Sequence, residues 1–341
     1  MAQTFRAGVI GCGAIAQALH LPGYRRRKDV VRLVGCDPDA TNLAEAKTKF
    51  KLDATYDDYR RMLADEALDL VSVCTPNCFH AEQAIAALEA GAALLLEKPV
   101  ATNVADAERI AEAVARTGRR CMVGFSHRLY ESNRRMHAVI REGRIGKPFM
   151  IRIRFAHRGP QPGWAKSDWF YRPQLAGGGA MLDMGIHAMD LARLLIGEVR
   201  SVAAQVATLR KPIEVDDNAV LGLAFDDALG YIEVGWTSMP GFTGVEVYGD
   251  EGTLINDYSQ PLRLGSGTAS PDAREKSAFT WQTLCEPRGG SWNIEMDHFV
   301  DGVIEGEPFG MDIADGVAAV RIACAAYESA RTGRRIELKG D

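Results

Sequence analysis

The chain has 341 residues, of which 47% are hydrophobic and 25% charged, and its formal net charge is −5. This composition is ordinary for a globular protein, and the length allows two domains with separate cores. A net negative charge does not attract nucleic acid or an anionic membrane, so we expect neither as a partner.

Two further classes of protein are disfavoured by the pattern of residues. No run of about 18 apolar residues is present, and the N-terminus lacks the features of a secretory signal, so we expect no membrane span and a cytoplasmic location. The seven cysteines are scattered and odd in number, which is typical of reduced, buried thiols. Cys74 and Cys78 have no second Cys/His pair to complete a zinc site, so we expect no metal.

Strand-like and helix-like segments alternate through the first third of the chain. The predicted strands are 5–10, 30–36, 68–74, 92–96 and 120–125. The segments between them, for example 81–90 and 104–117, have helical patterns. This alternation predicts an α/β domain with a doubly wound parallel sheet, which we assign to residues 1–124.

A dinucleotide fingerprint directly follows the first predicted strand and opens a helix. It consists of Gly11-Cys12-Gly13-Ala14-Ile15-Ala16. Gly11 allows a tight turn, Gly13 lets the backbone approach a pyrophosphate, and the small Ala16 lets the helix pack on the strand. Asp37 follows at the end of the second strand, at the spacing of a carboxylate that binds a ribose 2′-hydroxyl. Because Asp37 would repel a 2′-phosphate, we expect NAD, with NADP the alternative.

The rest of the chain, 125–341, is predicted to be an α+β domain. Alternating strand runs such as 150–155, 199–209, 219–225 and 230–236 come with few helices between them. This pattern indicates a large, mostly antiparallel open sheet. If one face of that sheet is open and apolar, a second copy of the chain would cover it, so we expect a homodimer or homotetramer.

Three residues form the predicted catalytic set. Asp183 and His187 are four positions apart behind the glycines at 177–179, so a helix would place them on one face. His187 is the best candidate for a general base, since an imidazole titrates near neutral pH; the alternative is a hydrogen-bonded core histidine. Asp183 would orient a hydroxyl, and its alternative is a helix cap. Lys98 follows the apolar run 92–96 and Glu97, and it would polarise a substrate oxygen, with a surface lysine as the alternative. Asp190 is assigned a structural role.

Taken together, these motifs resemble the Gfo/Idh/MocA family, named after glucose-fructose oxidoreductase, inositol dehydrogenase and rhizopine catabolism. The matching stretches are 11–16, 74–80, 87–91, 97–99, 177–190, 315–316 and 332–335. The resemblance implies a Rossmann domain followed by a domain whose sheet forms subunit contacts. It also implies an NAD(P)-dependent oxidoreductase acting on a sugar, a cyclitol or a sugar derivative. Some relatives instead use transient oxidation to drive glycoside cleavage or elimination, and others are dinucleotide sensors that lack the catalytic set.

The resemblance also implies roles for further residues. In the family the lysine contacts the nicotinamide region and substrate, often with a cis peptide before the proline. Expected cofactor contacts outside the fingerprint and Asp37 are Thr75, Pro76, Asn77, His80, Glu97 and Lys98. Weaker substrate-binding candidates, each balanced against simple packing or ion pairing, are Ser126, Arg128, His157, Trp164, Arg172 and Trp236. The aromatic cluster of Trp164, Trp169, Phe170 and Tyr171 is assigned to the core, with stacking on a sugar ring as its alternative.

Overall fold

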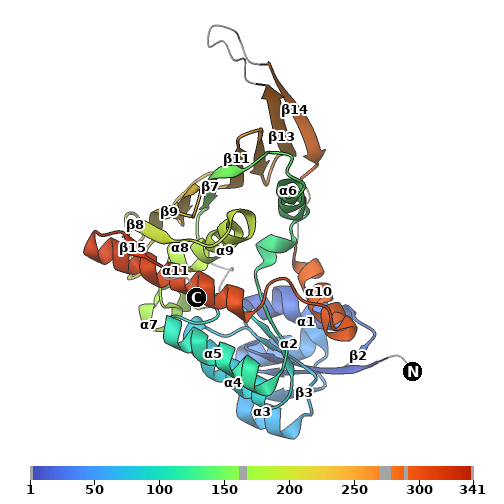
Figure 1. The fold of residues 1–341 in the computed structure, drawn as a ribbon. Helices are drawn as coiled ribbons and strands as arrows, with labels where there is room; N and C mark the ends of the chain where they lie inside the picture. The colour runs from blue at the N-terminus through green and yellow to red at the C-terminus, as the bar shows by residue number, and fades with distance from the viewer. Residues whose placement is uncertain (1–2, 161–166, 269–277, 288–290, 339–341) are drawn as a thin grey trace. The chain divides into compact units, whose positions relative to one another are not determined.

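The computed structural model describes residues 3–160, 167–268, 278–287 and 291–338. The chain forms two compact units, each assembled from segments that are separate in sequence (Figure 1). The first unit consists of residues 1–126, 160–178 and 292–320, and the second of 127–159, 179–291 and 321–341. Two later segments of the chain therefore return to the first unit. The division into domains 1–124 and 125–341 stays a prediction.

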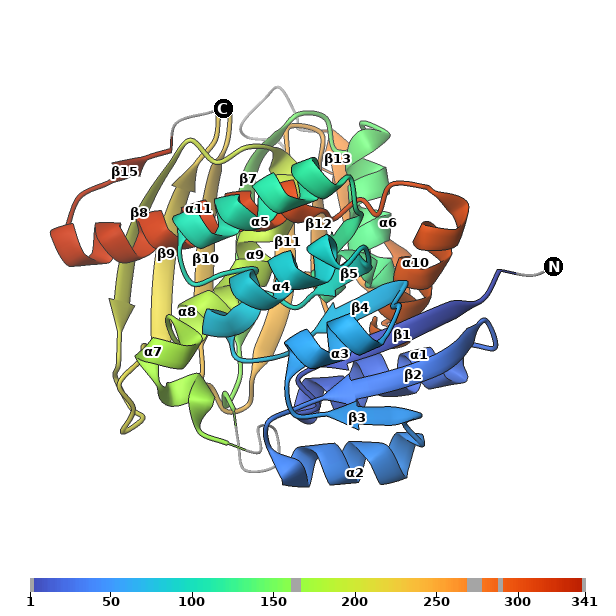
Figure 2. The same cartoon turned by 90° about the horizontal axis from the view of Figure 1, so that it is seen from below.

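A six-stranded parallel sheet is the centre of the first unit (Figure 2). Its strand order, β3-β2-β1-β4-β5-β6, reverses direction between β1 and β4, the position at which such sheets bind ligands. The strands are β1 (Phe5–Ile10), β2 (Val30–Cys36), β3 (Ala54–Tyr56), β4 (Leu70–Val73), β5 (Ala93–Leu96) and β6 (Cys121–Val123). The predicted parallel sheet is confirmed, and the three-residue β3 is an addition to it.

Helices connect these strands in sequence. They are η1 (Ala16–His20), α1 (Leu21–Arg26), α2 (Ala40–Phe50), α3 (Tyr59–Asp65), η2 (Asn77–Phe79), α4 (His80–Glu89) and α5 (Val104–Thr117). The later segments add η4 (Trp169–Tyr171), α7 (Pro173–Ala176), α10 (Trp292–Glu305) and the start of α11 (Ile313–Thr332). The first helix after the fingerprint differs from an ordinary α-helix, since η1 is a π-helical turn.

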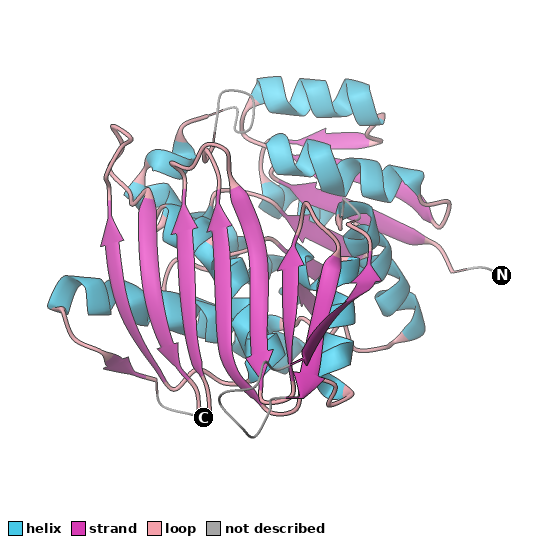
Figure 3. Ribbon diagram, turned by 90° about the horizontal axis from the view of Figure 1, so that it is seen from above, coloured by secondary structure: helices cyan, strands magenta, loops and turns pink. Residues whose placement is uncertain are grey.

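The second unit contains a nine-stranded sheet in the order β14-β13-β12-β11-β7-β10-β9-β8-β15 (Figure 3). All neighbouring strands are antiparallel except β7 and β10, so the predicted mostly antiparallel sheet is confirmed. The strands are β7 (Pro148–Ala156), β8 (Ser201–Ala207), β9 (Asn218–Ala224), β10 (Leu229–Gly235), β11 (Phe242–Gly249), β12 (Gly252–Asp257), β13 (Leu262–Thr268), β14 (Ala278–Cys285) and β15 (Ile336–Glu337).

Helices cover one face of this sheet. α9 (Gly185–Ile196) contacts β7 and β10, α8 (Ala180–Asp183) contacts β9 and β10, and α6 (Glu131–Arg141) contacts β12 and β14. The side chains that β7 directs toward these helices are fully buried, namely Ile151, Ile153 and Phe155. The short η3 (Ser126–Leu129) leads from the first unit into this layer.

The opposite face of the sheet is mixed: exposed apolar side chains such as Val220 (50% exposed) and Leu229 (57%) lie beside charged and aromatic residues, so the expectation of an apolar open face holds only in part. On β7 this face carries Arg152 and Arg154. The Arg152 guanidinium lies 3.6 Å from a Glu246 carboxylate oxygen and 4.8 Å from the ring centre of Tyr248. The Arg154 guanidinium lies 3.6 Å from the ring centre of Phe242. Ion pairs and cation–π contacts thus hold the charged side chains of this face among its apolar and aromatic residues.

The cysteines and the helices allow two further observations. None of the seven cysteines forms a disulfide bond, and four are buried. Cys78, Cys285 and Cys324 are half-buried, so the prediction of buried thiols is wrong for these three. Among the described residues, no helix has both the length and the apolar character needed to cross a membrane.

Candidate functional site

The glycine-rich turn after β1 has the geometry that a bound pyrophosphate requires. Gly11 has φ = +87°, and a Cβ there would lie 2.8 Å from the carbonyl carbon of Cys74, so only glycine fits. A Cβ on Gly13 would meet nothing within 4 Å, which leaves the backbone open to a ligand. Ala16 is fully buried, where a longer side chain would push the helix away from the strand. The geometry supports the roles predicted for these three residues.

Asp37 is held in place by the same turn. One of its carboxylate oxygens accepts the Cys12 N–H at 2.8 Å, and the other accepts the Asp39 N–H at 2.8 Å. Burial raises the pKa of Asp37, and these backbone hydrogen bonds partly offset the effect. The carboxylate is therefore fixed at the end of β2, where a ribose hydroxyl would donate to it.

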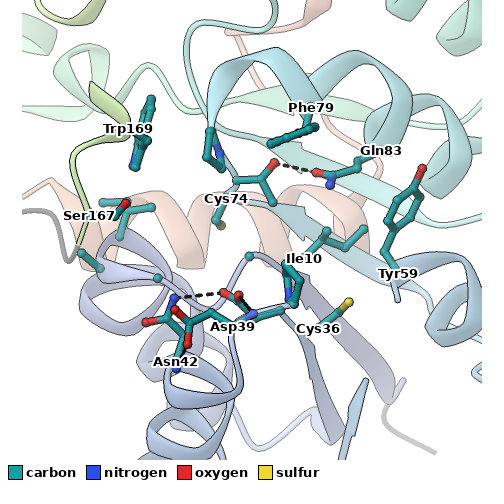
Figure 4. Close-up of a pocket in the computed structure, with 18 of the residues that line it drawn as sticks. Ile10, Cys36, Asp39, Asn42, Tyr59, Cys74, Phe79, Gln83, Ser167 and Trp169 are labelled. Carbon is teal, nitrogen blue, oxygen red and sulfur yellow. Dashed lines mark hydrogen bonds between the residues drawn. The ribbon is translucent and has the colours of Figure 1, made fainter. Parts of the chain in front are cut away.

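Asp37 and the fingerprint line a cavity of about 900 Å³ (Figure 4). A cavity of this volume is large enough for a dinucleotide. The residues expected to bind cofactor that line it are Gly11, Gly13, Ala14, Ile15, Asp37, Thr75 and Pro76. The expected residues that do not line it are Cys12, Ala16, Asn77, His80, Glu97 and Lys98. The glycine cradle, the anchored carboxylate and the volume together fit NAD.

The cavity has an acidic end that the sequence did not reveal. Asp57 and Asp58 follow β3 and line it together with Asp39. Arg60 is the one cationic side chain among the lining residues that the structure describes, and it forms an ion pair with Glu82. These residues could be assigned only after β3 was known, because they reach the cavity through a strand too short to predict. Their negative charge disfavours a 2′-phosphate.

A later segment of the chain forms another wall of the cavity. Trp169 and Phe170 stack with ring centres 3.9 Å apart and line it beside Ser167 (Figure 4). The segment is tied to the sheet because the Asn77 side-chain amide donates to the Ala176 carbonyl at 2.8 Å. The assignment of Trp169 and Phe170 to the core is therefore wrong, since both rings face the cavity. Trp164 lies outside the described residues.

The residues after β5 are turned toward the protein interior. Glu97 is 9% exposed, and one of its carboxylate oxygens accepts from His20 Nε2 at 2.9 Å. His80 is buried with its two ring nitrogens 2.8 Å and 2.9 Å from the carbonyl oxygens of Pro99 and Thr75. Burial lowers the pKa of His80, so it acts as a local hydrogen-bonding group. Lys98 is half-buried, and the Lys98–Pro99 peptide is cis.

In the second unit, Asp183 and His187 lie on two helices that follow each other almost without a break. α8 ends at Asp183 and α9 begins at Gly185, and Met184 between them keeps helical angles. The predicted single helix is thus interrupted by one residue. Its hydrogen bonds nevertheless continue, since the Met184 N–H donates to the Ala180 carbonyl at 2.9 Å. The helical spacing between the acid and the imidazole is retained.

Asp216 anchors the start of α8. Its two carboxylate oxygens accept the N–H groups of Gly179 at 2.8 Å and Met181 at 2.7 Å, and the Tyr327 hydroxyl donates to one of them at 2.7 Å. A Cβ on Gly179 would lie 1.9 Å from the Asp216 carbonyl oxygen, so the glycine is required by this close approach. Asp216 therefore supplies a cap for α8, which is the alternative role weighed for Asp183.

His187 is 5% exposed and has an aromatic neighbour that the sequence did not suggest. The ring centre of His127 lies 4.4 Å from that of His187 and 4.7 Å from that of Phe155. The next residue, Arg128, forms a two-fold ion pair with the buried Asp190 of α9, at 2.5 Å and 2.7 Å. This pair ties η3 to α9, and it gives Asp190 the structural role assigned to it.

The weaker substrate-binding candidates are placed as follows. Arg172 pairs with Asp168 on the surface, and the His157 ring accepts the Gly159 N–H at 2.8 Å. Trp236 is 1% exposed, which favours its packing alternative. Ser126 is half-buried at the start of η3. Substrate binding by Arg128, whose guanidinium is committed to Asp190, is disfavoured in the same way.

Comparisons with known proteins agree with this architecture. Residues 5–125 match the profile described as "Oxidoreductase family, NAD-binding Rossmann fold", and residues 133–255 match the "GFO/IDH/MocA C-terminal domain". The chain is 31% identical to D-glucoside 3-dehydrogenase of Escherichia coli K12, over 98% of this chain and 97% of that protein. It is 28% identical to myo-inositol 2-dehydrogenase of Thermotoga maritima, over 98% of each chain.

Solved structures give the same result. Levoglucosan dehydrogenase in complex with NADH superimposes with a TM-score of 0.86 at 26% identity, covering 99% of this chain and 100% of that chain. GenD2 from gentamicin A biosynthesis, in complex with NAD, has a TM-score of 0.85 at 27% identity, covering 100% of this chain and 98% of that chain. With the Rossmann sheet, the dinucleotide cavity and both domain profiles in place, the chain belongs to the Gfo/Idh/MocA family of NAD-binding oxidoreductases.

Proposed function

We propose that the protein transfers a hydride between NAD and a secondary alcohol or ketone carbon of a sugar, a cyclitol or a sugar derivative. The observation that carries this proposal is the presence of Lys98, Asp183 and His187 in a chain whose relatives are dehydrogenases. Those relatives are named for glucosides, inositol, levoglucosan and apiose. These substrates share a compact framework with several hydroxyl groups, and that chemistry defines the proposed substrate class.

The proposed roles follow from the chemistry of the three side chains. His187 removes the proton of the reacting hydroxyl and returns it in the reverse direction. Lys98 donates a hydrogen bond to the substrate oxygen and stabilises its negative charge as the proton leaves. Asp183 orients the hydroxyl or stabilises the charged imidazole. When bound, the nicotinamide supplies the hydride acceptor, and the chain supplies position and electrostatics.

Two structural features support the roles of Asp183 and His187. Asp216 accepts three N–H groups at the start of α8, one of them through its main-chain carbonyl, and also accepts the Tyr327 hydroxyl of α11; these hydrogen bonds limit movement of the helices that carry the pair. The ion pair between Arg128 and Asp190 fixes α9 against η3. Rigid support of this kind is what a positioned general base requires, because small displacements are costly for catalysis.

Substitution of the proposed catalytic residues tests the assignment. Lys98→Ala and His187→Ala should each reduce kcat by a factor of about 10² or more, because each removes a proton-transfer or charge-stabilising group. The Kd for NAD should change little. His137→Ala on α6 and Lys147→Ala on the surface are matched controls that should keep kcat. Unchanged kcat in both catalytic variants would refute the proposed roles.

We infer further that two or four copies of the chain assemble through the open face of the nine-stranded sheet. The support is the composition of that face, on which Arg152 and Arg154 lie beside Glu246 and aromatic rings. A two-fold axis would bring such a face against itself, arginines opposite glutamates. Sedimentation of wild type and Arg152→Glu tests this, since the charge reversal should increase the monomer fraction. If wild type and Arg152→Glu both sediment as monomers, the proposed assembly is refuted.

A cytoplasmic location is also a proposal. It is supported by the seven cysteines, none of them in a disulfide bond and four of them buried, which is typical of a reducing compartment. Fractionation of the producing cell would test it, and recovery of the protein outside the cytoplasm would overturn it.

A further inference from the structure

A buried acid in the first unit has no role in the site described above. Glu295 lies in the first turn of α10 and is 1% exposed. Neither of its carboxyl oxygens has a hydrogen-bond partner among the described residues. A buried polar group without a partner is rare, and a buried charge without one is rarer still. Glu295 therefore requires an explanation.

A second carboxyl group lies close to Glu295. The two acids meet over Gly124, just after β6. A Cβ built on Gly124 would be 3.2 Å from a Glu97 oxygen and 3.3 Å from a Glu295 oxygen, so these oxygens are at most about 6.5 Å apart. Both residues are at most 9% exposed. Two carboxyl groups this close in a protein interior do not both remain ionised.

The surroundings decide which of the two acids is charged. Burial by itself raises the pKa of Glu97, but the hydrogen bond from His20 and the positive charge of Lys98 outweigh it and lower the pKa overall. Burial raises the pKa of Glu295 far above its usual range, and the neighbouring Glu97 raises it further. Environments that separate the pKa values of two acids leave one as carboxylate and the other as the protonated acid. Glu97 is the carboxylate, and Glu295 holds the proton.

This pair lies next to the cofactor cavity. Cys74, at the end of β4, lines the cavity and is 8% exposed. Burial raises the pKa of the Cys74 thiol, and the carboxyl groups of Glu97 and Glu295 are near enough to raise it further. Cys74 is therefore a neighbour of both the cavity and the two acids. The pair is also at the carboxyl edge of β4, β5 and β6, the edge at which a parallel sheet of this kind binds its ligand.

The two forms of the cofactor differ in the charge of the nicotinamide ring. The nicotinamide ring is a cation in NAD and is neutral in NADH. A cation bound beside a buried acid stabilises the ionised form of that acid, whereas a neutral ring does not. We propose that Glu295 is a proton-binding site linked to the oxidation state of the dinucleotide: it keeps its proton in the free protein and with NADH, and releases it to solvent when NAD binds.

The proposal depends on dinucleotide binding, but on no particular substrate or catalytic side chain. The titratable groups that interact with Glu295 or Glu97 are His20, Cys74, His80 and Lys98, and the neighbouring helix α1 carries Tyr24, Arg25 and Arg26, of which Arg26 pairs with Asp297 of α10. By linkage, proton release on binding means that the affinity for NAD rises with pH, by at most about tenfold per pH unit, while the affinity for NADH does not.

Calorimetry with the intact protein tests the linkage directly. Titrations of NAD near neutral pH, in two buffers of different ionisation enthalpy, should show release of a substantial fraction of one proton, and titrations of NADH should show much less. Glu295→Gln keeps the shape of the side chain but has no proton to release, so its NAD titration should show little release. Glu295→Met, of similar volume, is the second variant. Equal proton release with NAD and NADH, or release that both variants retain, would overturn the proposal.

Infrared spectroscopy tests the resting state separately. The free wild-type protein should show the carbonyl stretch of a protonated carboxylic acid at neutral pH, and Glu295→Gln should lose it. Glu66→Gln is the matched control, because Glu66 is also buried but is ion-paired with Arg32 and Arg6, which hold its pKa at about 2. The Glu66→Gln variant should therefore keep the carbonyl band that we assign to Glu295. Absence of the band in wild type, or its persistence in Glu295→Gln, would overturn the assignment of the proton.

Discussion

Asp37→Asn should shift the cofactor preference of the protein from NAD toward NADP. The wild-type carboxylate is fixed by the N–H groups of Cys12 and Asp39 and lines the cavity, so it is poised to accept a ribose hydroxyl. A hydrogen bond to a charged group contributes about 1.5–3 kcal/mol. Its loss should weaken NAD binding by a factor of roughly 10 to 100.

The same substitution should improve NADP binding. A carboxylate and a phosphate charge about 5 Å apart repel each other by about 1–3 kcal/mol at effective dielectric constants between 20 and 80. Removing the Asp37 charge removes this repulsion, although Asp39, Asp57 and Asp58 continue to repel the phosphate. Together the two effects should change the ratio of the Kd values by a factor of about 10² or more.

Titration calorimetry with both dinucleotides measures this ratio without a substrate. Asp39→Asn is the matched control: it also removes a cavity charge, but asparagine keeps the helix cap that Asp39 provides to the N–H groups of Thr41 and Asn42. Its effect on the ratio should be clearly smaller. Thermal unfolding of Asp37→Asn checks that the turn survives the loss of a backbone acceptor. A ratio that stays within about twofold of wild type in a folded Asp37→Asn protein would refute the reasoning.

Two other predictions concern stability and catalysis. Hydrogen bonds from two arginines lower the pKa of Glu66 from 4.5 to about 2, so this group stabilises the fold above pH 4.5, and the contribution is lost as the pH falls toward 2. Glu66→Gln should reduce the free energy of unfolding at neutral pH by up to about 3 kcal/mol and make it depend less on pH in the acid range. Denaturant titrations at several pH values measure both effects. An unchanged dependence of the unfolding free energy on pH would contradict this prediction. Gly179→Ala should place a Cβ 1.9 Å from the Asp216 carbonyl oxygen and displace α8. We expect a fall in kcat of roughly 10²-fold with NAD binding retained, and wild-type kcat would argue against the anchor.

Local signals explain why much of the first unit was predictable. Residues 104–117 were expected to be helical, and α5 has those bounds because the Asn103 side chain accepts the Asp106 N–H and Gly118 ends the helix in the left-handed region. The fingerprint and Asp37 were likewise recognisable because strand, turn and carboxylate follow each other at fixed spacing. Strand β3, with three residues, gave no such signal.

The residues that the sequence did not reveal act through long-range contacts. Glu295 and Glu97 are far apart in the chain and meet only because α10 returns to the first unit. His127 approaches His187 through the packing of η3 on α9, which no local pattern encodes. Trp169 and Phe170 were recognised as aromatic, but aromatic residues are equally typical of cores and of ligand cavities, and only the fold separates the two cases.

Reduction of NAD by the purified protein is the measurement that tests the central claim most directly. The near-ultraviolet absorbance of NADH would be followed with a panel of sugars, cyclitols and their keto derivatives. We predict NADH formation with at least one polyhydroxylated compound and its loss in the Lys98→Ala and His187→Ala variants. Demonstrable NAD binding with no absorbance change across the panel, while glycosides in it are cleaved, would contradict the dehydrogenase assignment and favour redox-assisted cleavage.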